Sequence, residues 1–267
     1  MTDFIDLNRR FYKAADQNNP EALAQDSYLL SVLGDKGSLG WSEILQQHLV
    51  VILGEPGSGK STELFHKMDE LCDQSKYAFL LRLDRLVNES FLAVLGENKM
   101  TMFRKWKQGR GPAWFFFDSI DESKLRKPDD FLTVIDKISE AIGILELRRA
   151  FITFSSRISE WRPVTDTEAL RRHFPFSDQP INQEMEPRRQ KHDFSIGREN
   201  DSYMVDSQKK GEAVNNRPLI VLLAPLDRER IRRYAEGRGL SDPQAFLKAH
   251  IQGRSATKAE ATSSGVL

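Results

Sequence analysis

The residues of this 267-residue chain best suited to chemistry form one glycine-rich stretch, Gly54–Glu55–Pro56–Gly57–Ser58–Gly59–Lys60–Ser61–Thr62. Its fixed positions match G-x-x-x-x-G-K-[ST], a loop whose backbone N–H groups surround a phosphate chain. Glycines allow the tight turn and the close approach of the backbone to the anion. Lys60 would place its charge on the β- and γ-phosphates, and the Ser61 hydroxyl would reach a magnesium ion. The stretch therefore predicts a site for Mg²⁺ with ATP or GTP.

A second set of chemical groups follows the apolar run 113–117. Asp118 comes directly after this run, where it could hold magnesium opposite Ser61. Asp121 and Glu122 come next, and either acid could orient or deprotonate an attacking water. Ligands of open α/β sheets bind at the carboxyl ends of the strands, which is where these acids are expected.

A third candidate is Arg157, which follows the apolar run 150–154 and two serines. An arginine at this strand end could contact the γ-phosphate and report its hydrolysis. The alternative is a surface arginine that caps the edge of the sheet. The sequence leaves both interpretations open.

These residues require a scaffold in which strands alternate with helices. Continuous apolar runs predict five strands, at 49–53, 77–83, 113–117, 150–154 and 218–225. Apolar residues with helical spacing predict helices from Lys60 onward, over 88–108, over 129–148 and from 226 onward. Strands with apolar residues on both faces, separated by helices, are typical of a parallel sheet in an α/β fold.

The chain divides into three regions by composition. Residues 1–46 are predicted to form accessory helices, because apolar residues between positions 4 and 12 recur with helical spacing. Residues 47–240 contain the loop and the strands, with a mobile insertion expected at 177–217, where the sequence is polar and mixed in charge. Residues 241–267 are expected to form a helix and a disordered tail.

The overall composition restricts the partners of the chain. Lys+Arg and Asp+Glu each number 39, so the chain has no net charge that would attract nucleic acid. A zero net charge does not exclude a local basic patch on the surface. The single cysteine, Cys72, cannot form an internal disulfide and fits a reducing compartment. No apolar run approaches the roughly 20 residues of a membrane-spanning helix. We therefore expect a cytoplasmic protein with no membrane partner.

Taken together, the motifs resemble those of the NACHT branch of the STAND class of P-loop NTPases. Four segments carry this resemblance: the Walker A loop 54–62, the Walker B strand 115–122, the sensor strand 151–157 and the strand and helix 219–237. In this family a small residue and then further acids follow the magnesium aspartate, as they do after Asp118. The resemblance covers residues 41–240, the nucleotide-binding core alone.

The resemblance implies a P-loop three-layer sandwich with a five-stranded parallel sheet, in the order 5-1-4-3-2 along the chain. It also implies slow, Mg²⁺-dependent hydrolysis of ATP or GTP. The nucleotide state would switch a closed monomer to a homo-oligomer, in response to an unknown trigger or effector protein. Members of the family commonly serve innate immunity, programmed cell death or, in bacteria, defence against phage.

Three other functions share some of these motifs. An AAA+-type ATPase that acts on nucleic-acid complexes would have the same loop, but it usually carries glutamate where Ser119 follows Asp118. A non-catalytic scaffold would bind nucleotide without turnover. A small-molecule phosphotransferase would need an acceptor site, and the sequence shows no pattern for one.

Overall fold

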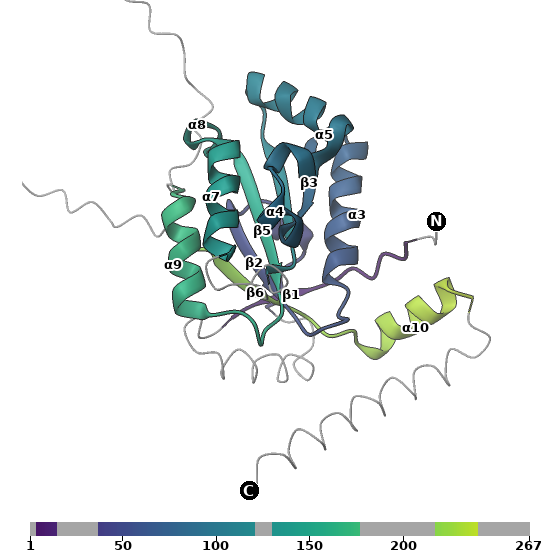
Figure 1. Ribbon diagram of the computed structural model, residues 1–267. Helices are drawn as coiled ribbons and strands as arrows, with labels where there is room; N and C mark the ends of the chain where they lie inside the picture. Colours follow the sequence, from purple (N-terminus) through teal and green to yellow (C-terminus); the bar gives the residue numbers. More distant parts are fainter. Residues whose placement is uncertain (1–3, 15–36, 121–129, 177–216, 240–267) are drawn as a thin grey trace, which may run out of the picture.

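A six-stranded mixed sheet organises the molecule, with the strands in the order β1-β6-β2-β5-β4-β3 (Figure 1). The computed structural model describes residues 4–14, 37–120, 130–176 and 217–239. The strands are β1 (Phe11–Lys13), β2 (Leu49–Leu53), β3 (Tyr77–Arg82), β4 (Ala113–Asp118), β5 (Ala150–Ser156) and β6 (Leu219–Leu223). The helices of the described part are α2 (Trp41–Ile44), α3 (Lys60–Asp73), α4 (Leu83–Asn88), α5 (Phe91–Gln108), α7 (Asp130–Ile142), α8 (Ile144–Leu147), α9 (Pro163–His173) and α10 (Arg228–Gly237).

Helices cover both faces of the sheet, which explains why the central strands are apolar at every position. In β2, Val50 and Ile52 pack with Leu64 and Met68 of α3 on one face. The alternate β2 residues pack on the opposite face with side chains of α4, α5, α7, α8 and α9. A strand with helices on both sides has no solvent-facing position, so its sequence shows no alternation of polar and apolar residues. The chain is therefore an α/β protein with three layers.

The prediction of a five-stranded, all-parallel sheet is wrong in strand number and order, because β1 adds a sixth strand at one edge. β1 runs antiparallel to β6, with Phe11 opposite Leu223. The other five strands are parallel, in the order β6-β2-β5-β4-β3. Residues Phe11 and Leu39 also exchange two backbone hydrogen bonds, of 2.9 and 2.7 Å. Edge pairing thus satisfies backbone groups that a helix would have satisfied internally.

Two predicted helical regions differ from the structure. The apolar spacing between positions 4 and 12 suggested a helix, but the same residues lie in a non-helical segment that leads into β1. The helix expected over 129–148 is instead divided into α7 and α8 at Gly143, whose φ of 82° is incompatible with a continuous right-handed helix. The expected insertion at 177–217, apart from its last residue, and the helix and tail after 240 lie outside the described residues.

No helix of the described part is both long and apolar enough to cross a membrane. The sheet instead buries its apolar side chains between its own helices.

The N-terminal strand should contribute strongly to stability, because Phe11 is fully buried between β6 and α2. Phe11→Ala should lower the free energy of unfolding by about 3–5 kcal/mol, since a large aromatic is removed and a cavity is left. Phe65→Ala is the matched control, because Phe65 is 46% exposed on α3. Chemical denaturation should show a loss of only about 0.5 kcal/mol for this control. Equal losses for both variants would contradict the importance of β1.

Candidate functional site

The glycine-rich loop connects β2 to α3 at the carboxyl edge of the parallel strands. Gly57 and Gly59 have φ values of 71° and 91°, which side chains with a Cβ rarely adopt. Gly59 is also the N-cap of α3, and no side chain caps the helix there. The first N–H groups of this helix can therefore donate to an acceptor from outside, such as a phosphate.

Lys60 places its ammonium group inside the loop. Its Nζ donates to the carbonyl oxygens of Gly54 at 2.8 Å and Glu55 at 3.0 Å, and to the Ser58 hydroxyl at 3.4 Å. These contacts keep the positive charge beside the N-terminus of α3. A cation and a helix N-terminus at one point favour an anion between them.

The carboxylate of Asp118 is held by the neighbouring strand. The Ser155 hydroxyl donates to Asp118 Oδ1 at 2.5 Å and accepts from the backbone N–H of Ser119 at 3.0 Å. Asp118 is only 8% exposed, and Ser155 is fully buried. Ser119 has a φ of 69°, an uncommon value outside glycine, and its hydrogen bond to Ser155 helps to hold it there. The Ser155 hydroxyl therefore fixes both the aspartate and the turn that follows it.

The strand register brings the loop and Asp118 to the same edge of the sheet. β5 lies between β2 and β4, with Leu53 opposite Ser156 and Phe117 opposite Phe154. Gly54 and Asp118 follow these paired positions directly. The two elements that the sequence predicted as a phosphate loop and a magnesium ligand are thus separated by one strand.

The remaining predicted site residues have different positions. Ser61 and Thr62 are exposed in the first turn of α3. Arg157 is exposed just beyond β5, where its carbonyl oxygen accepts from the N–H groups of Glu160 and Trp161. Asp121 and Glu122 lie outside the described residues.

In the part of the chain that the structure describes, the acidic groups near the loop do not form a complete metal site by themselves. Within the described ranges, no group of three or more His, Cys, Asp or Glu side chains could hold a metal ion. At phosphate sites, Mg²⁺ is bound by one or two protein oxygens together with phosphate oxygens and waters. The Ser61 hydroxyl and the Asp118 carboxylate are suitable donors for such a site.

A cavity of about 340 Å³ opens beside the loop. Its walls come from the N-terminal segment, the loop, the first turn of α3 and α10. Residues that line it include Phe4, Leu7, Thr62, Ile231 and Tyr234. The cavity combines apolar and aromatic walls with the glycine-rich loop at one side, a combination that suits a nucleoside attached to phosphates.

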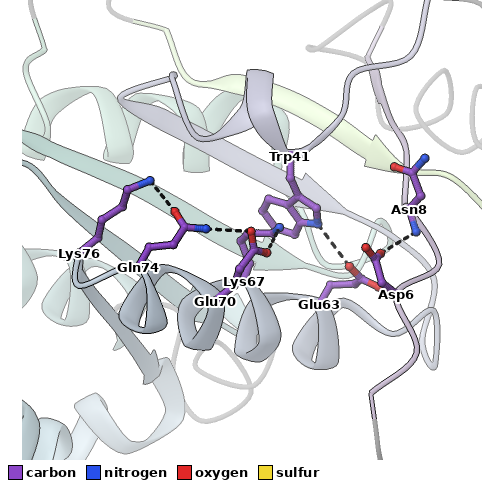
Figure 2. A network of polar contacts seen from close by, with 8 residues as sticks. All are labelled: Asp6, Asn8, Trp41, Glu63, Lys67, Glu70, Gln74 and Lys76. Atoms are coloured by element: carbon purple, nitrogen blue, oxygen red, sulfur yellow. Dashed lines mark hydrogen bonds and ion pairs between the residues drawn. The ribbon is translucent and has the colours of Figure 1, made fainter.

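Two charged residues that no sequence motif marks, Arg9 and Glu63, also line this cavity. Both are buried, at 4% and 8% exposure. Burial raises the pKa of the Glu63 carboxyl, while the indole N–H of Trp41 and the charge of Arg9 partly oppose the rise. Figure 2 shows Glu63 between Trp41, which donates to it at 3.3 Å, and Asp6. Nothing in the sequence distinguishes Arg9 from the adjacent Arg10, because only the tertiary fold buries it against the loop.

Comparisons with known proteins leave the family unassigned. No family model matches the chain, and no curated protein matches it. One similar solved structure is "Structure of Drosophila ORC bound to AT-rich DNA and Cdc6", with 12% identity and a TM-score of 0.30. The match covers 59% of this chain and 55% of that chain, so this chain spans about half of its length. A similarity of this degree supports no conclusion about function.

The raised pKa of Glu63 gives a test of its burial. Above the ordinary value of 4.5, the folded protein holds more protons on Glu63 than the unfolded chain does, so stability falls as pH rises through the shifted pKa. Glu63→Gln keeps an acceptor for Trp41 but removes this penalty. Its melting temperature should therefore exceed that of the wild type at about pH 8, and the difference should shrink towards pH 5.

Asp69→Asn is the control for this measurement, because Asp69 is exposed on the same helix. Melting curves of the control should stay close to those of the wild type across the same pH range. A pH-independent difference for Glu63→Gln would contradict a raised pKa.

Proposed function

We propose that this chain is a nucleoside triphosphatase that binds ATP or GTP with Mg²⁺ and hydrolyses it slowly. The observation that carries the proposal is the position of Lys60, whose ammonium group lies within a glycine-rich loop at the open N-terminus of α3. That arrangement provides a cation and backbone N–H donors for a polyphosphate. Gly54 to Thr62 would surround the β- and γ-phosphates.

The magnesium ligands of this proposal are the Ser61 hydroxyl and the Asp118 carboxylate. Bound Mg²⁺ would neutralise charge on the β- and γ-phosphates. The hydrogen bond from Ser155 supports the role of Asp118, because it fixes the orientation of the carboxylate. Asp121 or Glu122 would orient the attacking water, and Arg157 would contact the γ-phosphate from the end of β5.

The cavity beside Thr62 would receive the nucleoside. Phe4 and Tyr234 are aromatic groups that could contact a base, and they come from the N-terminal segment and from α10. The nucleotide would thus contact two segments that are far apart in sequence. Contacts of this kind suit a switch in which the nucleotide state controls assembly with further copies of the chain. We extend the proposal to a role in innate immunity or defence against phage, which is supported only by the resemblance of the motifs to those of NACHT proteins.

The proposal predicts that phosphate release depends on both Lys60 and Asp118. Lys60→Ala should weaken Mg-ATP binding at least about tenfold, because a charge-assisted contact to phosphate is lost. Asp118→Asn should abolish Mg²⁺-dependent phosphate release while nucleotide binding in EDTA is retained. Release from Mg-ATP and Mg-GTP, with binding measured by calorimetry, checks both. Lys76→Ala, an exposed lysine beyond α3, is the matched control.

The same assay separates the alternative functions. Tight binding without turnover, dependent on Lys60, would indicate a nucleotide-binding scaffold. Turnover stimulated by DNA would favour an AAA+-type ATPase. Absence of nucleotide binding by the folded wild-type chain would overturn the proposal.

A further inference from the structure

Arg9 is a buried cation that lies directly against the phosphate loop. It is only 4% exposed. Its Nη1 donates to the carbonyl oxygen of Ser58 at 2.8 Å, and its Nη2 donates to that of Ala224 at 2.7 Å. A Cβ built on Gly59 would lie 3.4 Å from Nη1. The guanidinium group thus joins the loop to the end of β6.

The contact with Ser58 determines how the next peptide unit is oriented. No peptide bond of the described backbone is cis, so the Ser58 C=O and the Gly59 N–H point in opposite directions. Because the carbonyl oxygen faces Arg9, the Gly59 N–H faces away from Arg9. Gly59, with a φ of 91°, does not itself fix this orientation of the Ser58–Gly59 peptide unit, since glycine allows many backbone conformations. A charged donor on the carbonyl side therefore selects one of them.

The charge of Arg9 should also strengthen the loop as an anion site. Hydrogen bonds from an ionised donor are stronger than neutral ones, and a peptide polarised at its oxygen becomes a better donor at its N–H. The guanidinium acts over a short distance in a buried environment, where water screens it little. Its charge also reaches Glu63, on whose pKa it has a lowering influence.

The position of Arg9 is itself fixed from two sides. The backbone N–H of Ala224 donates to the carbonyl oxygen of Arg10 at 2.9 Å. Arg230 of α10 donates from Nε to the carbonyl oxygen of Leu7 at 3.0 Å. The segment that carries Arg9 is therefore held by β6 and by α10, so the guanidinium can act as a fixed support for the loop.

We infer that Arg9 is a positioning residue for phosphate binding, which acts through the Ser58–Gly59 peptide and directs the Gly59 N–H towards the β-phosphate of the nucleotide. The inference rests on the proposed function, since it assumes that the loop binds a nucleotide. Arg9 also lines the cavity beside the loop, but its inferred role is exerted through the Ser58 carbonyl oxygen and needs no contact with the nucleotide. Its removal should weaken the binding of nucleotides that carry a β-phosphate and spare those that lack one.

The test compares affinities of the wild-type chain and Arg9→Ala for Mg-ATP, ADP and AMP by calorimetry, with AMP titrated to millimolar concentration. ATP and ADP should each bind about tenfold more weakly to the variant, the effect of one charge-assisted hydrogen bond. AMP should bind within about twofold of wild type, because it lacks the β-phosphate that the Gly59 N–H is inferred to contact. Lys13→Ala, an exposed change in the same N-terminal segment, should leave all three affinities unchanged.

Chemical rescue is a second test of the role of the Arg9 guanidinium group. Guanidinium ion at tens of millimolar should restore part of the ATP affinity of Arg9→Ala, whereas methylammonium at the same concentration should not, because it lacks the planar fork of donors. Circular dichroism should first establish that the variant is folded. If it is not, Arg9→Gln takes its place in the nucleotide comparison, with the same pattern expected because it removes the charge.

Two results would overturn the inference. Equal ATP affinity in the wild type and a folded Arg9 variant would show that the loop does not need this support. Equal losses for ATP, ADP and AMP would show that Arg9 only maintains the wall of the cavity. Failure of the wild-type chain to bind ATP would instead overturn the proposed function, so the two failures are distinguishable.

Discussion

The orientation of the backbone in the loop after β2 is the constraint on which the candidate site depends. A loop that binds an anion must direct N–H groups inward, and its carbonyl oxygens must then find donors elsewhere. Lys60 takes the carbonyl oxygens of Gly54 and Glu55, and Arg9 takes that of Ser58. Two cations, one from the start of α3 and one from the N-terminal segment, thus donate to the carbonyl oxygens of one loop. Both positive charges therefore lie against the loop.

The sheet provides the second part of the site. β5 lies between the strand that leads to the loop and the strand that ends in Asp118. Its Ser155 is buried and uses its hydroxyl as both donor and acceptor, so Asp118 and Ser119 are held together. Buried polar groups of this kind stabilise a structure only when they are fully paired. β5 therefore separates the loop from Asp118 and also contributes Ser155 to the candidate site.

The third part comes from the two ends of the described chain. The N-terminal segment pairs with β6 through β1, and α10 contacts the same segment through Arg230 and Leu7. Together they form a wall of the cavity beside Thr62. A ligand in this cavity would contact segments that precede and follow the central sheet. Since a ligand stabilises the arrangement that it binds best, nucleotide binding and the packing of these segments would be coupled.

The α/β class, the positions of the five parallel strands and the loop with Lys60 could be predicted from the sequence, because continuous apolar runs and a glycine-lysine pattern are local signals. The sequence also placed Asp118 at a strand end. The edge strand at residues 11–13 could not be predicted in this way, since its apolar spacing fits a helix or a strand equally until β6 offers unpaired backbone groups. The roles of Arg9, Glu63 and Ser155 were likewise decided by burial against distant segments. An arginine, a glutamate or a serine has no local mark of burial, because the partners that compensate its lost hydration lie far away in the sequence.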